Sequence, residues 1–139
     1  MGLWAPTDKL PLAVSAGVYN VAIDSPGSNQ AMAYGLVSYT LPASAFGVRV
    51  TAGGYSGQKT GLQVPGAGDP ETSGYLAGLD KTIGKWWLGA DYQSGRNVVG
   101  AASVGVGYSI DDKTSVILGY DHYNVGEPHS INFQVDMNL

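Results

Sequence analysis

The chain has 139 residues, enough for one domain; 13% of them are charged, and the net charge is −4. It contains no cysteine, which excludes disulfides, cysteine-based zinc sites and thiol catalysis. The acidic balance and the lack of any lysine or arginine cluster argue against nucleic acid as a partner, and no apolar run is long enough for a membrane-spanning helix.

Apolar and polar residues alternate with a period of two along most of the chain, which predicts strands. The expected strands span residues 10–23, 30–41, 45–57, 72–82, 85–94, 97–110, 114–125 and 130–139. Only the connection 58–71 is long, so neighbouring strands are expected to pair as antiparallel hairpins. Strands that cross a membrane need about 9–11 residues, whereas globular strands average about 5–6. The sequence therefore predicts an all-β fold, an eight-stranded antiparallel up-and-down transmembrane β-barrel with one domain over 1–139.

Four glycines recur at nearly even spacing along the chain. Gly17, Gly53, Gly89 and Gly119 are 36, 36 and 30 residues apart, and each stands two residues before a tyrosine or an aspartate. A period of this length fits one hairpin unit, and four hairpins supply the strands of a small barrel. We expect these glycines to face the lumen, where a missing side chain leaves room for a bulky or charged neighbour.

The two faces of the expected strands differ in chemistry, most clearly in the last one. There Ile131, Phe133 and Val135 alternate with Asn132 and Gln134. One face is continuously apolar and uncharged, and the other is small and polar. Because the interior of an eight-stranded barrel is narrow, large apolar side chains fit outside it better than inside. The sequence therefore predicts an apolar exterior that faces lipid.

The polar face supplies the candidate lumen residues. They are Tyr19, Arg49, Tyr55, Asp80, Asp91, Asp121, Asn132, Gln134 and Asp136. A buried guanidinium needs carboxylate partners, so Arg49 is expected to pair with Asp80 or Asp136.

Asp91 and Asp121 have two interpretations. They form a cation-binding site, or they form a hydrogen-bonded plug with tyrosine hydroxyls, Asn132 and Gln134. Narrow barrel interiors are usually filled, which favours the plug. Lys59 or Arg96 from the loops is expected to reach these two carboxylates. Nothing places a substrate between them, so no catalytic residue and no enzyme activity are predicted.

Outward aromatic residues near the strand ends are a further candidate feature. They are Tyr39, Phe46, Tyr75, Trp86, Tyr92 and Tyr108. Aromatic side chains concentrate at the two interfaces of a membrane, so the sequence predicts two aromatic girdles around the apolar band.

Segments such as Lys85-Trp86-Trp87-Leu88-Gly89-Ala90-Asp91-Tyr92-Gln93-Ser94-Gly95 and Ile117-Leu118-Gly119-Tyr120-Asp121 carry a resemblance of pattern. In them the chain resembles small bacterial outer-membrane β-barrels of the eight-stranded OmpA/OmpX-like type. The resemblance implies a structural or narrow porin-like role in the bacterial outer membrane, with a lipid bilayer or detergent as partner and no cofactor. It also implies a monomer, with self-association as the alternative. No signal peptide follows Met1, so a mature form is expected.

Other interpretations stay open. A soluble up-and-down barrel that binds a small apolar ligand is the alternative from another class. The terminal residue Leu139 is not aromatic and only one loop is long, so a trimmed or engineered barrel, or a part of a larger one, is also considered. The two histidines, His122 and His129, have no metal-ligand partner at a recognisable spacing, and no metal site is predicted.

Overall fold

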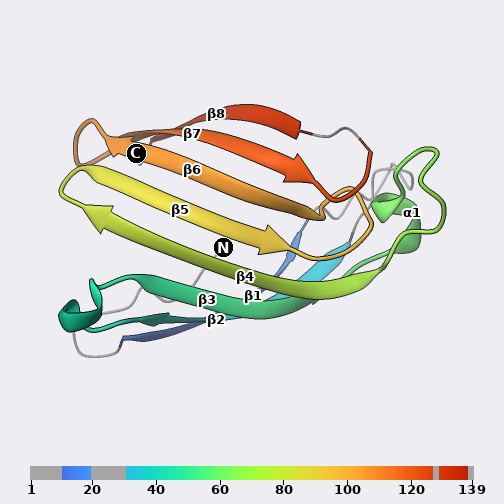
Figure 1. Cartoon of the computed structure of the whole chain (residues 1–139), viewed down its shortest axis with the longest axis horizontal. Coiled ribbons are helices and arrows are strands. Elements are labelled where there is room, and N and C mark those ends of the chain that lie inside the picture. The colour runs from blue at the N-terminus through green and yellow to red at the C-terminus, as the bar shows by residue number, and fades with distance from the viewer. Residues whose placement is uncertain (1–10, 20–30, 127–128, 138–139) are drawn as a thin grey trace.

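The computed structural model describes residues 11–19, 31–126 and 129–137, and they form one eight-stranded sheet (Figure 1). The strand order is β1-β2-β3-β4-β5-β6-β7-β8, and every pair of neighbours is antiparallel. The predicted all-β meander is therefore confirmed. Within these residues no ladder joins β1 to β8, so closure into a barrel stays a prediction.

The strands are somewhat shorter than expected, at 8–11 residues. Their bounds are β1 (Leu12–Tyr19), β2 (Met32–Thr40), β3 (Arg49–Ser56), β4 (Ser73–Ile83), β5 (Trp86–Gln93), β6 (Ala101–Ser109), β7 (Thr114–Tyr123) and β8 (His129–Met137). Two short helices, η2 (Ala43–Ala45) and α1 (Lys59–Leu62), lie in connections where no helix was predicted. The predicted strand ends at 10, 20–23, 30 and 138–139 lie outside the described residues.

Local turn chemistry ends the strands at one end of the sheet. Gly84, between β4 and β5, has a φ of +61°, which favours glycine, and Phe46 after η2 adopts the same left-handed region with a φ of 63°. Between β6 and β7, Asp111 Oδ1 accepts the backbone N–H groups of Lys113 and Thr114, each at 2.8 Å. These bonds stabilise the ionised carboxylate and lower the pKa of Asp111.

The sheet is strongly curved, so that β4 to β8 arch over β1 to β3 (Figure 1). A cavity of about 520 Å³ lies on the concave side. Its lining comes from both halves of the sheet and includes Tyr19, Tyr34, Leu76, Gln93, Asp121 and Tyr123. We call the face that borders this cavity the inner face and the opposite one the outer face.

The outer face is apolar and exposed, as the alternation predicts. The exposed fraction is 74% for Ile131 and 68% for Phe133. Among the charged residues of the described strands, only Lys81 belongs to the outer face. It lies near the end of β4, where its Nζ donates to the carbonyl oxygen of Phe46 and stands 5.8 Å from the centroid of that ring. The ammonium therefore lies at the rim beside the turn.

The most deeply buried side chains lie in connections rather than in the sheet. Leu62 at the end of α1 and Asn97 in the β5–β6 connection are fully buried. The backbone N–H of Val98 donates to the carbonyl oxygen of Leu62 over 3.2 Å, which fastens the long connection to the β5–β6 connection. We call these joined connections, 58–72 and 94–100, the cap. No helix in the described part of the chain is long and apolar enough to cross a membrane.

Candidate functional site: the polar inner face

Strand register places the polar residues of the inner face in rows across the sheet. One row runs through Gly78, Asp91, Ser103, Asp121 and Ser130, on five successive strands. The two aspartates are therefore separated by a single small residue, Ser103. The sequence prediction that both face inward agrees with this register, since side chains that share a row share a face.

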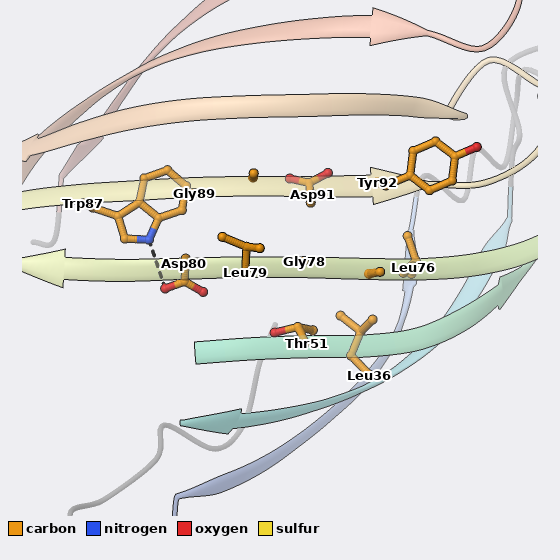
Figure 2. A pocket seen from close by; sticks show the side chains of 12 residues that line it. Leu36, Thr51, Leu76, Gly78, Leu79, Asp80, Trp87, Gly89, Asp91 and Tyr92 are labelled. Atoms are coloured by element: carbon orange, nitrogen blue, oxygen red, sulfur yellow. Dashed lines mark hydrogen bonds between the residues drawn. The ribbon is translucent and has the colours of Figure 1, made fainter. Parts of the chain in front are cut away.

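An ion pair lies at the turn end of the inner face. Arg49 Nε stands 2.8 Å from Asp80 Oδ1, which is the first of the two pairings expected from the sequence. The second Asp80 oxygen, Oδ2, accepts the indole N–H of Trp87 over 3.3 Å (Figure 2). Asp136, the other predicted partner, instead accepts the Gln134 amide at 2.7 Å. The Arg49 side chain is 42% exposed, so the guanidinium is less buried than the sequence suggested.

Replacing Arg49 by methionine should lower stability in detergent. Asp80 would keep only the Trp87 N–H, and we expect a loss of about 1 kcal/mol, because the arginine is partly solvated. The measurement is the midpoint of urea unfolding. Lys59→Met is the matched control, since the Lys59–Asp69 pair, 2.9 Å apart, is exposed and its loss should be within about 0.5 kcal/mol of zero. Equal midpoints for the two variants would contradict a structural role for the inner pair.

A second hydrogen-bonded cluster surrounds Asp121. Its Oδ2 accepts the Asn132 amide at 2.8 Å and the Ser130 hydroxyl at 3.0 Å. The Tyr123 hydroxyl lies 3.1 Å from Ser130 Oγ and extends the chain of bonds. Asn132 therefore fulfils its predicted role as a partner, whereas Gln134 bonds to Asp136 and not to Asp121.

Asp91 differs from Asp121 because its carboxylate has no hydrogen-bond partner within the described residues. It lies on β5 opposite Gly78 of β4 and lines one pocket with Leu76 and Thr51 (Figure 2). The expected approach of Lys59 or Arg96 to the two aspartates is not formed. Lys59 pairs with Asp69 of its own connection, and Arg96 uses its backbone N–H to bind Glu71 Oε2 at 2.8 Å. The ammonium of Lys59 is therefore paired within the cap, and no ion pair joins Arg96 to either aspartate among the described residues.

Tyr55 belongs to the cap and not to the aspartate clusters. Its side chain is only 5% exposed, and its hydroxyl donates to the carbonyl oxygen of Ser94. The hydroxyl also accepts the Asn97 amide at 2.8 Å. The predicted plug of tyrosine hydroxyls and aspartates therefore does not include Tyr55. Asn97 is a structural residue that the sequence analysis missed, because a single asparagine in a turn gives no signal of burial.

Three of the recurrent glycines leave room for the side chain of a residue on the neighbouring strand. A Cβ at Gly17 would meet the Tyr34 ring, one at Gly53 would meet Leu36, and one at Gly119 would meet Asn132. In each case the neighbour is the register partner on the next strand. The neighbour that each missing side chain accommodates is therefore the residue opposite it, because opposed side chains lie closer than those along one strand.

Gly89 follows a different arrangement, in which Trp87 of the same strand covers it. A Cβ at Gly89 would stand 2.5 Å from Trp87 Cη2, and Cβ atoms at Gly105 and Gly107 would also touch the indole. Gly89, Gly105 and Gly119 are register partners, so the inner face carries no side chain at this level of β5, β6 and β7. Trp87 is thus a central inner-face residue that sequence reasoning did not single out. Glycines on neighbouring strands at the same level are the pattern that could have indicated a large side chain lying over them.

The predicted interface aromatics lie on the outer side of the sheet and its turns. The exposed fraction reaches 75% for Phe46. Two pairs form at opposite ends of β5: Trp86 with Tyr108, ring centroids 4.8 Å apart, and Tyr75 with Tyr92, 5.8 Å apart. Tyr39 is also exposed. No larger aromatic cluster occurs in the part of the chain that the structure describes, so continuous girdles stay a prediction.

The described residues of the inner face offer carboxylate, amide and hydroxyl groups, with one guanidinium. Within those residues, no set of three or more histidine, aspartate or glutamate side chains could enclose a metal ion. Comparison with known proteins gives no relative: no protein-family model, curated protein or solved structure matches the chain.

Proposed function

We propose that the chain is an integral β-barrel of the bacterial outer membrane. In this proposal β1 and β8 pair to close the sheet, the outer face contacts acyl chains, and the inner face lines a narrow lumen. The role is structural, or that of a narrow porin-like pore, and it involves no catalysis and no cofactor. Bacterial barrels of this kind reside in the outer membrane, which gives the expected location.

The segregation of the strand residues supports this proposal most directly. The outer face exposes large apolar side chains on every strand but carries one charge, Lys81, at its rim. The other charged strand residues, Arg49, Asp80, Asp91, Asp121 and Asp136, occupy the inner face. Water would disfavour so large an exposed apolar surface, whereas a bilayer would favour it.

The height of the apolar face also suits a bilayer. Strands of 8–11 residues at about 3.3 Å per residue, tilted by about 40°, extend about 20–28 Å along a barrel axis. Outer-membrane barrels have an apolar band of about 25 Å. The outward aromatic pairs near the two ends of β5 would then lie at the two interfaces as parts of the predicted girdles.

The contents of the inner face favour a filled barrel over an open pore. Trp87 covers Gly89, Gly105 and Gly107, Tyr34 lies over Gly17, and Val98 and Val99 of the cap line the cavity of the inner face. Conductance across a planar bilayer separates the two roles: silence indicates a structural barrel, and steady cation-selective steps indicate a pore.

The adjacent tryptophans of β5 test the orientation of the sheet. Trp86 is 53% exposed on the outer face, whereas Trp87 lies on the inner face and binds Asp80. Two single-tryptophan proteins are made in a Trp4→Phe background, with Trp87→Phe or Trp86→Phe. In vesicles of lipids brominated near the headgroup, we expect strong quenching of Trp86 fluorescence and several-fold weaker quenching of Trp87.

Each outcome of this experiment separates the interpretations. Equal quenching of the two residues, or stronger quenching of Trp87, would contradict the apolar-out orientation. Failure of both proteins to enter vesicles, together with a monodisperse state without detergent, would favour the soluble barrel. Far-UV circular dichroism of both variants shows whether the sheet content is kept.

The 520 Å³ cavity is the observation that favours this second candidate, a soluble barrel with an apolar ligand inside. Met32, Leu36 and Leu76 line it beside the polar groups. Its size is that of small-molecule sites in general. Because its lining also contains Asp121 and Gln93, the membrane proposal is the better supported of the two.

A further inference from the structure

The only two histidines of the chain occupy directly opposed positions on neighbouring strands. His122 on β7 and His129 on β8 are register partners, at the last pair before the β7–β8 connection. Both residues are exposed, on the outer face. Their separation along the sequence matches no metal-binding motif, and the hairpin register alone brings them together.

The geometry of an antiparallel pair suits chelation by these two side chains. Directly opposed residues have Cβ atoms about 4.5–5.5 Å apart, and metal–nitrogen bonds are about 2.0–2.1 Å long, so two imidazoles can converge on one ion. The His129 ring also stacks on Tyr120, with centroids 6.1 Å apart and planes inclined by 20°. This stacking limits the rotation of the His129 imidazole before an ion binds.

A hollow of about 430 Å³ adjoins His122 on the side of β5 and the cap. His122 lines it together with Glu71, Arg96 and Asn124. The small residue Ala102 separates His122 from Tyr92 across the sheet, which leaves space above it. Both histidines are exposed, so water molecules can complete the coordination shell when the protein supplies only two ligands.

We propose that His122 and His129 form a chelating site for a divalent transition-metal ion of the copper, nickel or zinc class. Imidazole suits these borderline metals, whereas hard cations such as Mg²⁺ prefer oxygen. Two protein ligands leave coordination positions open, so the bound ion exchanges with solvent and can accept a further ligand. This site goes beyond the proposed membrane role and does not depend on it.

Titration of the untagged full chain with Ni²⁺, followed by calorimetry in chelator-free detergent, tests the site. We expect one ion per chain. Because a chelate needs both imidazoles, His122→Ala and His129→Ala should each weaken binding by at least about tenfold, the lower range seen even for indirect metal-supporting residues. Cu²⁺ should bind more tightly than Ni²⁺, and Mg²⁺ should give no binding at this site.

The matched control leaves the histidines in place and removes the charge of two inner-face carboxylates. The double variant Asp91→Asn, Asp121→Asn should bind Ni²⁺ as the unaltered chain does, because those carboxylates lie on the inner face. Absence of Ni²⁺ binding to the unaltered chain, retention of binding by a variant that lacks both histidines, or dependence on the aspartates would each overturn the proposal. Circular dichroism checks that the histidine variants keep their sheet content; both positions are exposed.

Discussion

Replacing Gly53 by alanine should lower the free energy of unfolding by about 2–4 kcal/mol. A Cβ at this position would overlap the carbonyl oxygen of Gly35 and stand 2.9 Å from the Cα of Leu36. Those atoms belong to the backbone of β2, which cannot rotate away as a side chain can. The strands must therefore separate or shift, and the β2–β3 ladder weakens. Urea unfolding in detergent, followed by near-ultraviolet circular dichroism, measures the loss.

Gly35→Ala is the control for this prediction. Gly35 belongs to the neighbouring strand, and a Cβ there would meet nothing within 4 Å. Alanine should be neutral or should stabilise by up to about 0.5–1 kcal/mol, because it has less backbone freedom to lose in a strand. If the two variants unfold at the same urea concentration, the close approach of β2 and β3 at Gly53 is not the reason that this position requires glycine.

Replacing Asn97 by alanine should lower the free energy of unfolding by about 2–4 kcal/mol. The buried amide donates to the Tyr55 hydroxyl at 2.8 Å and to the carbonyl oxygen of Glu71 at 2.7 Å. Its Oδ1 accepts the backbone N–H groups of Val99 and Gly100, at 3.1 and 2.9 Å. Alanine leaves these groups unpaired away from water. We also expect faster proteolysis within 58–72, measured by mass spectrometry of the fragments, because the cap loses its main attachment.

Asn124→Ala offers a control of the same residue type at the same end of the sheet. Asn124 is exposed, and its amide donates to the carbonyl oxygens of Gln93 and Gly95 at 3.1 and 2.9 Å. Water can replace these bonds, so the cost should stay below about 1 kcal/mol. An equal loss for the two asparagines would show that burial of Asn97 does not decide the stability of the cap.

The meander and the composition of its two faces followed from the sequence alone. Short connections permit only antiparallel neighbours, and the period of two in strands such as β8 assigns each residue to a face. The Arg49–Asp80 pair was predicted as one of two choices, because a cation on the inner face needs a nearby carboxylate. These inferences need only local geometry and charge.

The partners across the sheet required the tertiary structure. Register decides that Gly17 faces Tyr34, that Trp87 covers three glycines, and that His122 meets His129. Folding of the cap likewise decides that Asn97 is buried and that Lys59 binds Asp69. A sequence pattern gives the face of a residue, since successive residues of one strand point to alternate faces. Its neighbours depend on the offset between two strands and on how a loop folds back, and neither is encoded in the spacing along one segment.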